Sequence, residues 1–211
     1  MAAPLSAVIF DYGGVISNMR WDVSRALEAR HRLPDGCLRQ TLWGCAAWQD
    51  VERGRGDVEA WRAHAHAEVE RIAGRSLPPL HAEWREQMGL ILENVAAVRA
   101  LRPRYRVGLL SNADATLRAR LQARMLLEAF DHIVCSAEVG YAKPEPEIYA
   151  LACQGLGMQP EACVFVDDHE PNVMAAEAAG MRGIHFLVDR GDDLRAQLAA
   201  VGIRATSDPA A

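Results

Sequence analysis

The sequence predicts an α/β fold, in which a doubly wound, Rossmann-like parallel sheet carries an inserted all-helical cap. In residues 95–211, short apolar runs typical of buried parallel strands alternate with stretches of helical periodicity. Residues 16–94 show helical spacing and no convincing strand. We therefore assign residues 1–15 and 95–211 to an α/β core domain, and residues 16–94 to a helical cap domain.

The first predicted strand covers residues 7–10 and is followed directly by Asp11. Two glycines, Gly13 and Gly14, follow after Tyr12, and they free the backbone to turn and to approach a ligand closely. This stretch is typical of a buried strand that delivers a carboxylate to a pocket. An ordinary turn after a strand is the alternative, and this stretch alone does not decide between them.

The segment after this strand contains all five tryptophans of the chain. Helical spacing recurs within it, for example at Val23, Ala26 and Leu27. We expect most of the tryptophans to form the core of a small helical bundle, with one or two facing a ligand. They are Trp21, Trp43, Trp48, Trp61 and Trp84.

The rest of the chain predicts four more strands with helices between them. In chain order, the expected elements are a strand over 106–110, a helix containing Leu117, Leu121, Met125 and Leu126, a strand over 133–135, a helix from about Pro146, a strand over 163–166, a helix over 172–179 that Gly180 ends, and a strand over 183–187.

Polar residues follow several of the predicted strands, where an open α/β sheet binds its ligands. These residues are Asp11, Ser111, Asp167 and Asp168, and a loop adds Lys143. Grouped carboxylates repel one another unless a cation lies among them, and oxygen ligands of this kind suit Mg²⁺. Ser111 leads into a helix N-terminus, which favours a phosphate. The sequence therefore predicts a phosphate site with Mg²⁺ and a nucleophile aimed at phosphorus.

Composition limits the partners. The 211 residues carry 23 Lys and Arg against 28 Asp and Glu, a net charge of −5, so no basic field is available for nucleic acid or an anionic membrane. The five cysteines form no Cys-x-x-Cys pair, and no leader or membrane-spanning stretch is evident. We expect a cytoplasmic monomer or homodimer that binds a small phosphorylated metabolite.

Four motifs in this order resemble those of the haloacid dehalogenase superfamily. They are Asp11-x-Gly13-Gly14-Val15, Leu110-Ser111-Asn112, Lys143-Pro144 and Phe165-Val166-Asp167-Asp168. The helical insertion resembles the small cap of the subgroup that contains phosphoglycolate phosphatase, β-phosphoglucomutase and the 2-haloacid dehalogenases. Within that subgroup, the run Glu52-Arg53-Gly54 through Asp57 resembles the bacterial α-glucose-1-phosphate phosphatases.

The resemblance implies a role for each motif. Asp11 would be the nucleophile that forms an aspartyl-phosphate and would also contact Mg²⁺, and Ser111 would bind the transferring phosphoryl group. Lys143 would stabilise the negative charges of the Asp11 nucleophile and of the phosphate. Asp168 would bind the metal directly, and Asp167 would act through water or as a partner of Lys143. Without the resemblance, Ser111 is also explained as a helix N-cap and Lys143 as a solvated loop residue.

Further residues are expected around this centre. The expected substrate-binding residues are Gly14, Asn112, Trp48 and Glu52. The main departure from the family lies at Gly13, because most of its phosphatases have a second aspartate there that protonates the leaving group. Loss of such a group typically costs about 10² to 10⁴ in rate. The family contacts the metal through the backbone carbonyl of this position, so Gly13 can keep that contact.

Three functions remain open at this point. The first is a Mg²⁺-dependent phosphatase in which a good leaving group, a water or a cap residue replaces the missing acid. The second is a metal-independent dehalogenase, against which the Asp167-Asp168 pair and the non-aromatic Gly13 both argue. The third is a phosphometabolite-binding or partner-binding protein without turnover.

Overall fold

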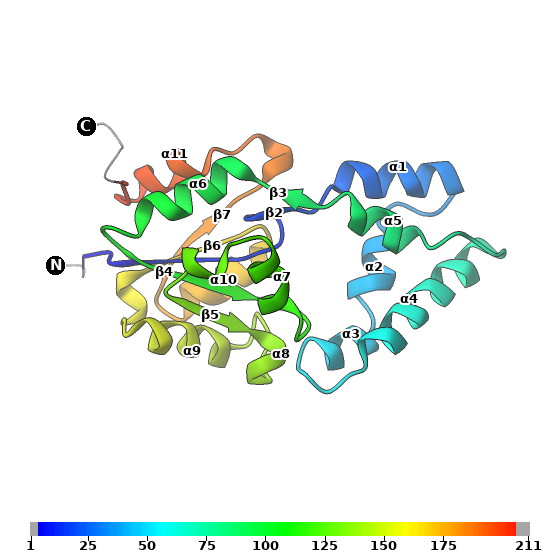
Figure 1. Cartoon of the computed structure of the whole chain (residues 1–211), viewed down its shortest axis with the longest axis horizontal. Coiled ribbons are helices and arrows are strands. Elements are labelled where there is room, and N and C mark those ends of the chain that lie inside the picture. The colour runs from blue at the N-terminus through cyan, green and yellow to red at the C-terminus, as the bar shows by residue number, and fades with distance from the viewer. Residues whose placement is uncertain (1–3, 206–211) are drawn as a thin grey trace.

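The core is a five-stranded parallel sheet covered by helices on both faces (Figure 1). The computed structural model describes residues 4–205, so both ends of the predicted core domain, residues 1–3 and 206–211, lie outside the described part. The strand order is β5-β4-β1-β6-β7. The strands are β1 (Ala7–Phe10), β4 (Arg106–Ser111), β5 (His132–Cys135), β6 (Cys163–Asp167) and β7 (Arg182–His185). The predicted α/β fold is confirmed.

Strand register brings the polar residues to one edge. Phe10 pairs with Leu109 of β4 and with Val166 of β6. The backbone N–H of Asp11 donates to the carbonyl of Val166 at 2.9 Å. Because β1 lies between β4 and β6, Asp11, Ser111 and Asp167 all end at the carboxyl edge of the sheet.

Alternation along each strand supplies a core on both faces of the sheet. Val8 and Phe10 pack with one helical layer, and Ala7 and Ile9 pack with the other. The first layer contains α6 (Leu92–Leu101), α7 (Leu117–Ala123) and α11 (Leu194–Ala200). The second contains α9 (Pro146–Leu156) and α10 (Glu170–Ala178). Shorter elements are α8 (Ser136–Val139), η1 (Leu127–Ala129), η2 (Pro160–Ala162) and η3 (Val188–Arg190).

The cap is a helical unit with an apolar core of its own, at the right of Figure 1. Its helices are α1 (Trp21–His31), α2 (Cys37–Trp43), α3 (Ala46–Val51), α4 (Val58–Ala73) and α5 (Leu80–Glu86). A two-stranded antiparallel ribbon joins it to the core, formed by β2 (Ser17–Asn18) and β3 (Gly89–Leu90). Sequence periodicity missed this ribbon, because two-residue strands are too short to show alternation.

One helix is shorter than predicted. α7 ends at Ala123, so Met125 and Leu126 lie beyond it. The backbone of Met125 is left-handed, with φ of 54°, and its side chain is 81% exposed. The N–H of Leu126 then donates to the carbonyl of Leu121 at 2.9 Å, which returns the buried Leu126 side chain to the core. Leu126 is therefore a core residue although the helix ends before it, whereas Met125 is exposed.

Among the described helices, none combines the length and the apolar character needed to cross a membrane.

Candidate active site

Lys143 lies between two carboxylates at the carboxyl edge of the sheet. Its Nζ is 2.9 Å from Oδ1 of Asp11 and donates to Oδ2 of Asp167 at 2.5 Å. All three residues are buried. Burial lowers the pKa of the Lys143 ammonium, but Asp11 and Asp167 outweigh that effect and hold this pKa above its usual value. The predicted alternative of a solvated loop lysine is wrong, because this ammonium is enclosed by the site.

The loop that carries Lys143 is fixed by Asn112. Nδ2 of Asn112 donates to the carbonyl of Lys143 at 3.0 Å, and the N–H of Lys143 donates to Oδ1 of Asn112 at 2.8 Å. Both polar atoms of this side chain therefore hold the Lys143 backbone. Asn112 also lines the cavity described below, and its predicted contact with substrate stays a prediction.

Asp167 is fully buried and positions Lys143. Its Oδ1 accepts from the N–H of His169 at 2.8 Å, and Nδ2 of Asn172 donates to both of its oxygens at 3.2 and 3.1 Å. The hydroxyl of Tyr149 donates to the carbonyl of Asn172 at 2.9 Å, which ties α9 to this network. We expected Asn172 only to start a helix. Its role was missed because its position against Asp167 depends on the turn between β6 and α10.

Asp168 completes a cluster suited to a divalent cation. Carboxylate oxygens of Asp11, Asp167 and Asp168 all lie within 4.8 Å of one another. With Lys143 protonated, three ionised carboxylates leave the cluster a net charge of minus two. Burial first, and then the charges of Asp11 and Asp167, raise the pKa of Asp168 to about 7. Burial likewise raises the pKa of Asp11 to about 6, although Lys143 opposes it.

The cluster therefore fits Mg²⁺, because an ion of charge plus two with a preference for oxygen ligands would neutralise it. Asp11 and Asp168 would hold the cation, since Asp167 already accepts hydrogen bonds from Lys143, Asn172 and His169. The predicted contact through the carbonyl of Gly13 stays a prediction.

The two glycines after Asp11 have different surroundings. The backbone of Gly14 has φ of 74°, and a Cβ there would lie 2.1 Å from Oδ2 of Asp168. Gly14 thus makes room for a metal-type ligand, and it does not line the cavity, so its predicted substrate contact remains untested. A Cβ on Gly13 would lie 3.2 Å from Sδ of Met19, a flexible side chain.

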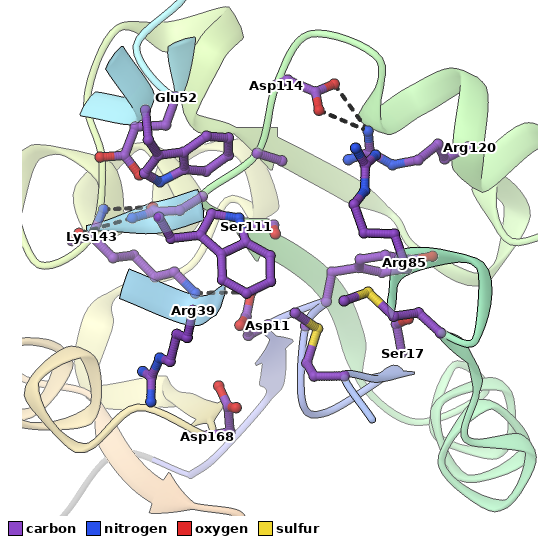
Figure 2. A pocket seen from close by; sticks show the side chains of 18 of the residues that line it. Asp11, Ser17, Arg39, Glu52, Arg85, Ser111, Asp114, Arg120, Lys143 and Asp168 are labelled. Atoms are coloured by element: carbon purple, nitrogen blue, oxygen red, sulfur yellow. Dashed lines mark hydrogen bonds and ion pairs between the residues drawn. The ribbon is translucent and has the colours of Figure 1, made fainter. Parts of the chain in front are cut away.

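A cavity of about 330 Å³ opens above this cluster, between core and cap (Figure 2). Asp11, Ser111, Lys143 and Asp168 line it from the core. Four tryptophans line it from the cap, more than the one or two expected: Trp21, Trp43, Trp48 and Trp61. Trp48 and Trp61 are also buried in the cap core, so they both pack inside the cap and line the cavity. The predicted residues Trp48 and Glu52 both reach the cavity.

The cavity also contains charged residues that the sequence did not single out. Arg39, Arg85 and Arg120 reach it together with Asp114. The guanidinium of Arg39 lies 5.1 Å from the ring centroid of Trp21, a cation–π contact. An arginine in an amphipathic helix is usually solvated, so no sequence pattern distinguishes these from surface residues.

An ion pair at the cavity rim joins cap and core. Arg53 donates to Oε1 of Glu52 at 2.9 Å and to Oε1 of Glu145 at 2.5 Å. Oε2 of Glu145 accepts from the N–H of Ala142, beside Lys143. A Cβ on Gly54 would lie 2.2 Å from the carbonyl of Ala137, so this cap loop packs directly on the core.

The acidic cluster makes stability depend on pH. Folding raises the pKa of Asp11 and Asp168, so both bind protons more tightly in the folded chain. Their stabilising contribution is complete below about pH 4 and is lost as the pH rises through 6 and 7. In EDTA, we expect these two groups to lower the free energy of unfolding by about 1–2 kcal/mol between pH 6 and pH 8. Saturating Mg²⁺ should remove most of that loss.

Calorimetric melting at pH 6 and pH 8, with EDTA or with Mg²⁺, measures this effect. The variant Asp168→Asn isolates it from the histidines, which titrate in the same range. A pH dependence that is unchanged in Asp168→Asn would contradict the assignment.

Comparisons with known proteins agree with this geometry. Residues 5–180 match the family model of the haloacid dehalogenase-like hydrolases. The chain is 36% identical over 200 residues to phosphatase MT3486 of Mycobacterium tuberculosis, and this alignment covers 90% of each protein. It is 28% identical over 206 residues to the phosphorylated carbohydrates phosphatase of Thermotoga maritima, and this alignment covers 93% of this chain and 91% of that protein. A HAD family enzyme from Bacteroides thetaiotaomicron, solved in complex with magnesium and inorganic phosphate, has a similar fold, with a TM-score of 0.64 and 21% identity over 90% of this chain and 97% of that one.

Proposed function

This chain belongs to the haloacid dehalogenase-like hydrolase family, and from that premise we propose that it is a Mg²⁺-dependent phosphatase of small phosphorylated metabolites. The observation that supports this most directly is the Asp11–Lys143–Asp167 arrangement beside Asp168, at the base of a cavity. The phosphatase relatives from Mycobacterium tuberculosis and Thermotoga maritima support the same activity.

In the proposed reaction, a carboxylate oxygen of Asp11 attacks the phosphorus atom. The new bond from this oxygen to phosphorus replaces the bond to the ester oxygen, which leaves with a proton. Water then releases inorganic phosphate and regenerates Asp11. Bound Mg²⁺ would offset negative charge on the phosphoryl oxygens.

The surrounding residues hold the reacting groups. Lys143 stays protonated, fixes Oδ1 of Asp11 and adds positive charge beside the phosphoryl group. Ser111 is buried at the end of β4 and lines the cavity, where its hydroxyl would donate to a phosphoryl oxygen. Because both Asp167 and Asn112 position Lys143, this arrangement is preorganised before substrate arrives.

We further propose that Gly13 stands where most phosphatases of the family have their second aspartate. Proton donation would then come from water or from the cap, or the leaving group would need none. Among the cap residues described as lining the cavity, Glu52 is the one carboxyl group. Burial, partly offset by Arg53, raises the pKa of Glu52, which favours its protonated form as an acid.

Restoring the acid tests this idea. We expect Gly13→Asp, which requires only a small shift of Met19, to raise the rate about 10- to 100-fold on alkyl phosphates and much less on p-nitrophenyl phosphate. The difference follows because a good leaving group departs without a proton. Rates on a series of esters with graded leaving groups measure it, with Gly13→Asn as the isosteric control that lacks the acid. An equal gain on every ester would mean that the new carboxyl group does not act by protonating the leaving group, and no gain on any ester would mean that the acid is already supplied elsewhere.

The activity itself is tested by phosphate release. A panel of sugar, triose and aryl phosphates, with and without EDTA, should give Mg²⁺-dependent turnover. Tight binding of these esters without release would favour the non-catalytic alternative. Release of halide from a 2-haloacid in EDTA would favour the dehalogenase.

Several finer points belong to the same proposal. A preference for α-glucose 1-phosphate rests on Glu52-Arg53-Gly54 through Asp57, of which Arg53 joins cap to core and Asp57 caps α4 through the N–H of Ala60 at 2.7 Å. A division at residues 15/16 and 94/95, a monomeric or homodimeric state and a cytoplasmic location stay predictions of the sequence.

A further inference from the structure

Arg85 is a guanidinium in the cavity wall that forms no ion pair with a carboxylate of the described chain. Arg85 lies in α5 of the cap, is partly buried and lines the cavity. Within residues 4–205, no carboxylate is paired with it and no acceptor receives a hydrogen bond from its side chain. A partly buried charge without an ion-pair partner is stabilised by a nearby anion, so this position favours an anion supplied from outside the chain.

The carboxylates nearest to Arg85 form ion pairs with other arginines. Arg120 donates to both oxygens of Asp114, at 2.9 and 3.0 Å, and Arg62 donates to Glu59 at 2.9 Å. Arg62 and Arg120 thus each have a carboxylate partner, whereas Arg85 has none within ion-pair distance in the described part of the chain. Burial, and then the positive charges of Arg62 and Arg120, lower the pKa of Arg85, and the opposing effects of Asp114 and Glu59 are smaller.

The location of Arg85 distinguishes it from the phosphate site. Figure 2 shows the Arg85 side chain directed toward Arg120 and Asp114, on the side of the cavity away from Lys143. Both groups line the same cavity, and apolar side chains, including Trp43 and Met88, contribute to the wall as well. A volume of about 330 Å³ is at the small end for metabolite sites, so one small molecule fills it.

We propose that Arg85 binds a second anionic group of the substrate, a carboxylate or a second phosphate, while the scissile phosphate lies at Asp11. The preferred substrates are then small phosphate monoesters that carry another anion. This inference rests on the proposed phosphatase function. The planar guanidinium suits both anions, since it offers parallel N–H donors to two oxygens of either one.

Matched substrates that differ in one group test the proposal. The hexose set is α-D-glucose 1-phosphate, α-D-glucuronic acid 1-phosphate and α-D-glucose 1,6-bisphosphate. The triose pair is sn-glycerol 3-phosphate and 3-phosphoglycerate. In at least one set, we expect a higher kcat/KM for an anionic member than for its neutral counterpart. The acid and the bisphosphate distinguish a carboxylate site from a phosphate site.

Variants of Arg85 then assign the preference to this residue. Arg85→Gln should lower the ratio of kcat/KM between anionic and neutral members about 10- to 100-fold, the loss expected for hydrogen bonds between charged groups. Arg85→Lys should keep part of the ratio. Arg71→Gln removes one positive charge from an exposed ion pair on α4, and it should leave the ratio unchanged. An equal fall of both members in Arg85→Gln, or no preference in the wild type, would overturn the proposal.

Failure of the proposed function has a different signature. If no ester is hydrolysed, including p-nitrophenyl phosphate, the phosphatase proposal fails. Binding then tests Arg85 separately, because the tryptophans in the cavity wall report ligand by their fluorescence. Titration with 3-phosphoglycerate and with sn-glycerol 3-phosphate should show tighter binding of the first in the wild type and a reduced difference in Arg85→Gln. Equal affinities in the wild type would overturn the inference on this second route.

Discussion

Asp11→Asn is expected to abolish phosphate release, with a fall in kcat of at least about 10⁴-fold, because a neutral amide neither attacks phosphorus nor leaves as a carboxylate. The change is nearly isosteric. The substitution removes the buried Asp11 carboxyl group, whose pKa is raised by burial. The folded chain should therefore not lose stability in EDTA. Mg²⁺ should bind more weakly, since one of the three carboxylates of its predicted site is lost.

Rapid-quench measurement of phosphate, together with thermal melting, checks both parts. Asp22→Asn is the matched control, because Asp22 pairs with Arg20 on the exposed surface of α1. That control should keep full activity. Turnover in Asp11→Asn within about tenfold of the wild type would exclude Asp11 as the nucleophile.

Lys143→Met should cost both stability and activity. It leaves Asp11 and Asp167 facing each other in a buried site without the ammonium between them. Removal of one partner from a buried ion pair typically costs about 3–5 kcal/mol, so we expect a loss of this size at pH 7.5 in EDTA. The loss should shrink toward pH 5, because a carboxyl group that loses its cation takes up a proton more readily. Phosphate release should fall at least about 10³-fold, since Lys143 also orients Asp11.

A double variant separates charge from chemistry. Lys143→Met with Asp167→Asn removes the surplus negative charge, so it should recover a large part of the lost stability but none of the activity. Denaturant unfolding at pH 5 and pH 7.5 measures the recovery. Equal stability of the single and double variants would show that the cost of Lys143→Met comes from packing, and not from uncompensated charge.

The sequence predicted those parts of the site that depend on strands. Asp11, Ser111 and Asp167 follow apolar runs, and parallel pairing brings the carboxyl ends of such runs to one edge. Lys143 was predicted with them from its order in the chain. Local pattern and topology are enough to predict where these residues lie, because the carboxyl ends of parallel strands all meet at the same edge of the sheet.

Residues whose roles depend on docking could not be predicted in this way. Arg85 lies in a short cap helix, and its relation to Asp114 exists only once the cap packs over the core. Asn112 and Asn172 were similarly undervalued. Their amides bond to Lys143 and Asp167 across gaps of 31 and 5 residues, and a single sequence contains no record of such contacts.

The central place of β1 has a consequence for how the chain is made. β1 is synthesised before β4 and β6, the two strands with which it pairs, and these begin only at Arg106 and Cys163. Until most of the chain has been synthesised, the apolar strand β1 has both edges unpaired, because β4 and β6 do not yet exist. The cap has a separate apolar core and can form during that interval. The proposed active site therefore forms late in synthesis, and a nascent chain that ends before β6 would contain Asp11 without Asp167 and Asp168.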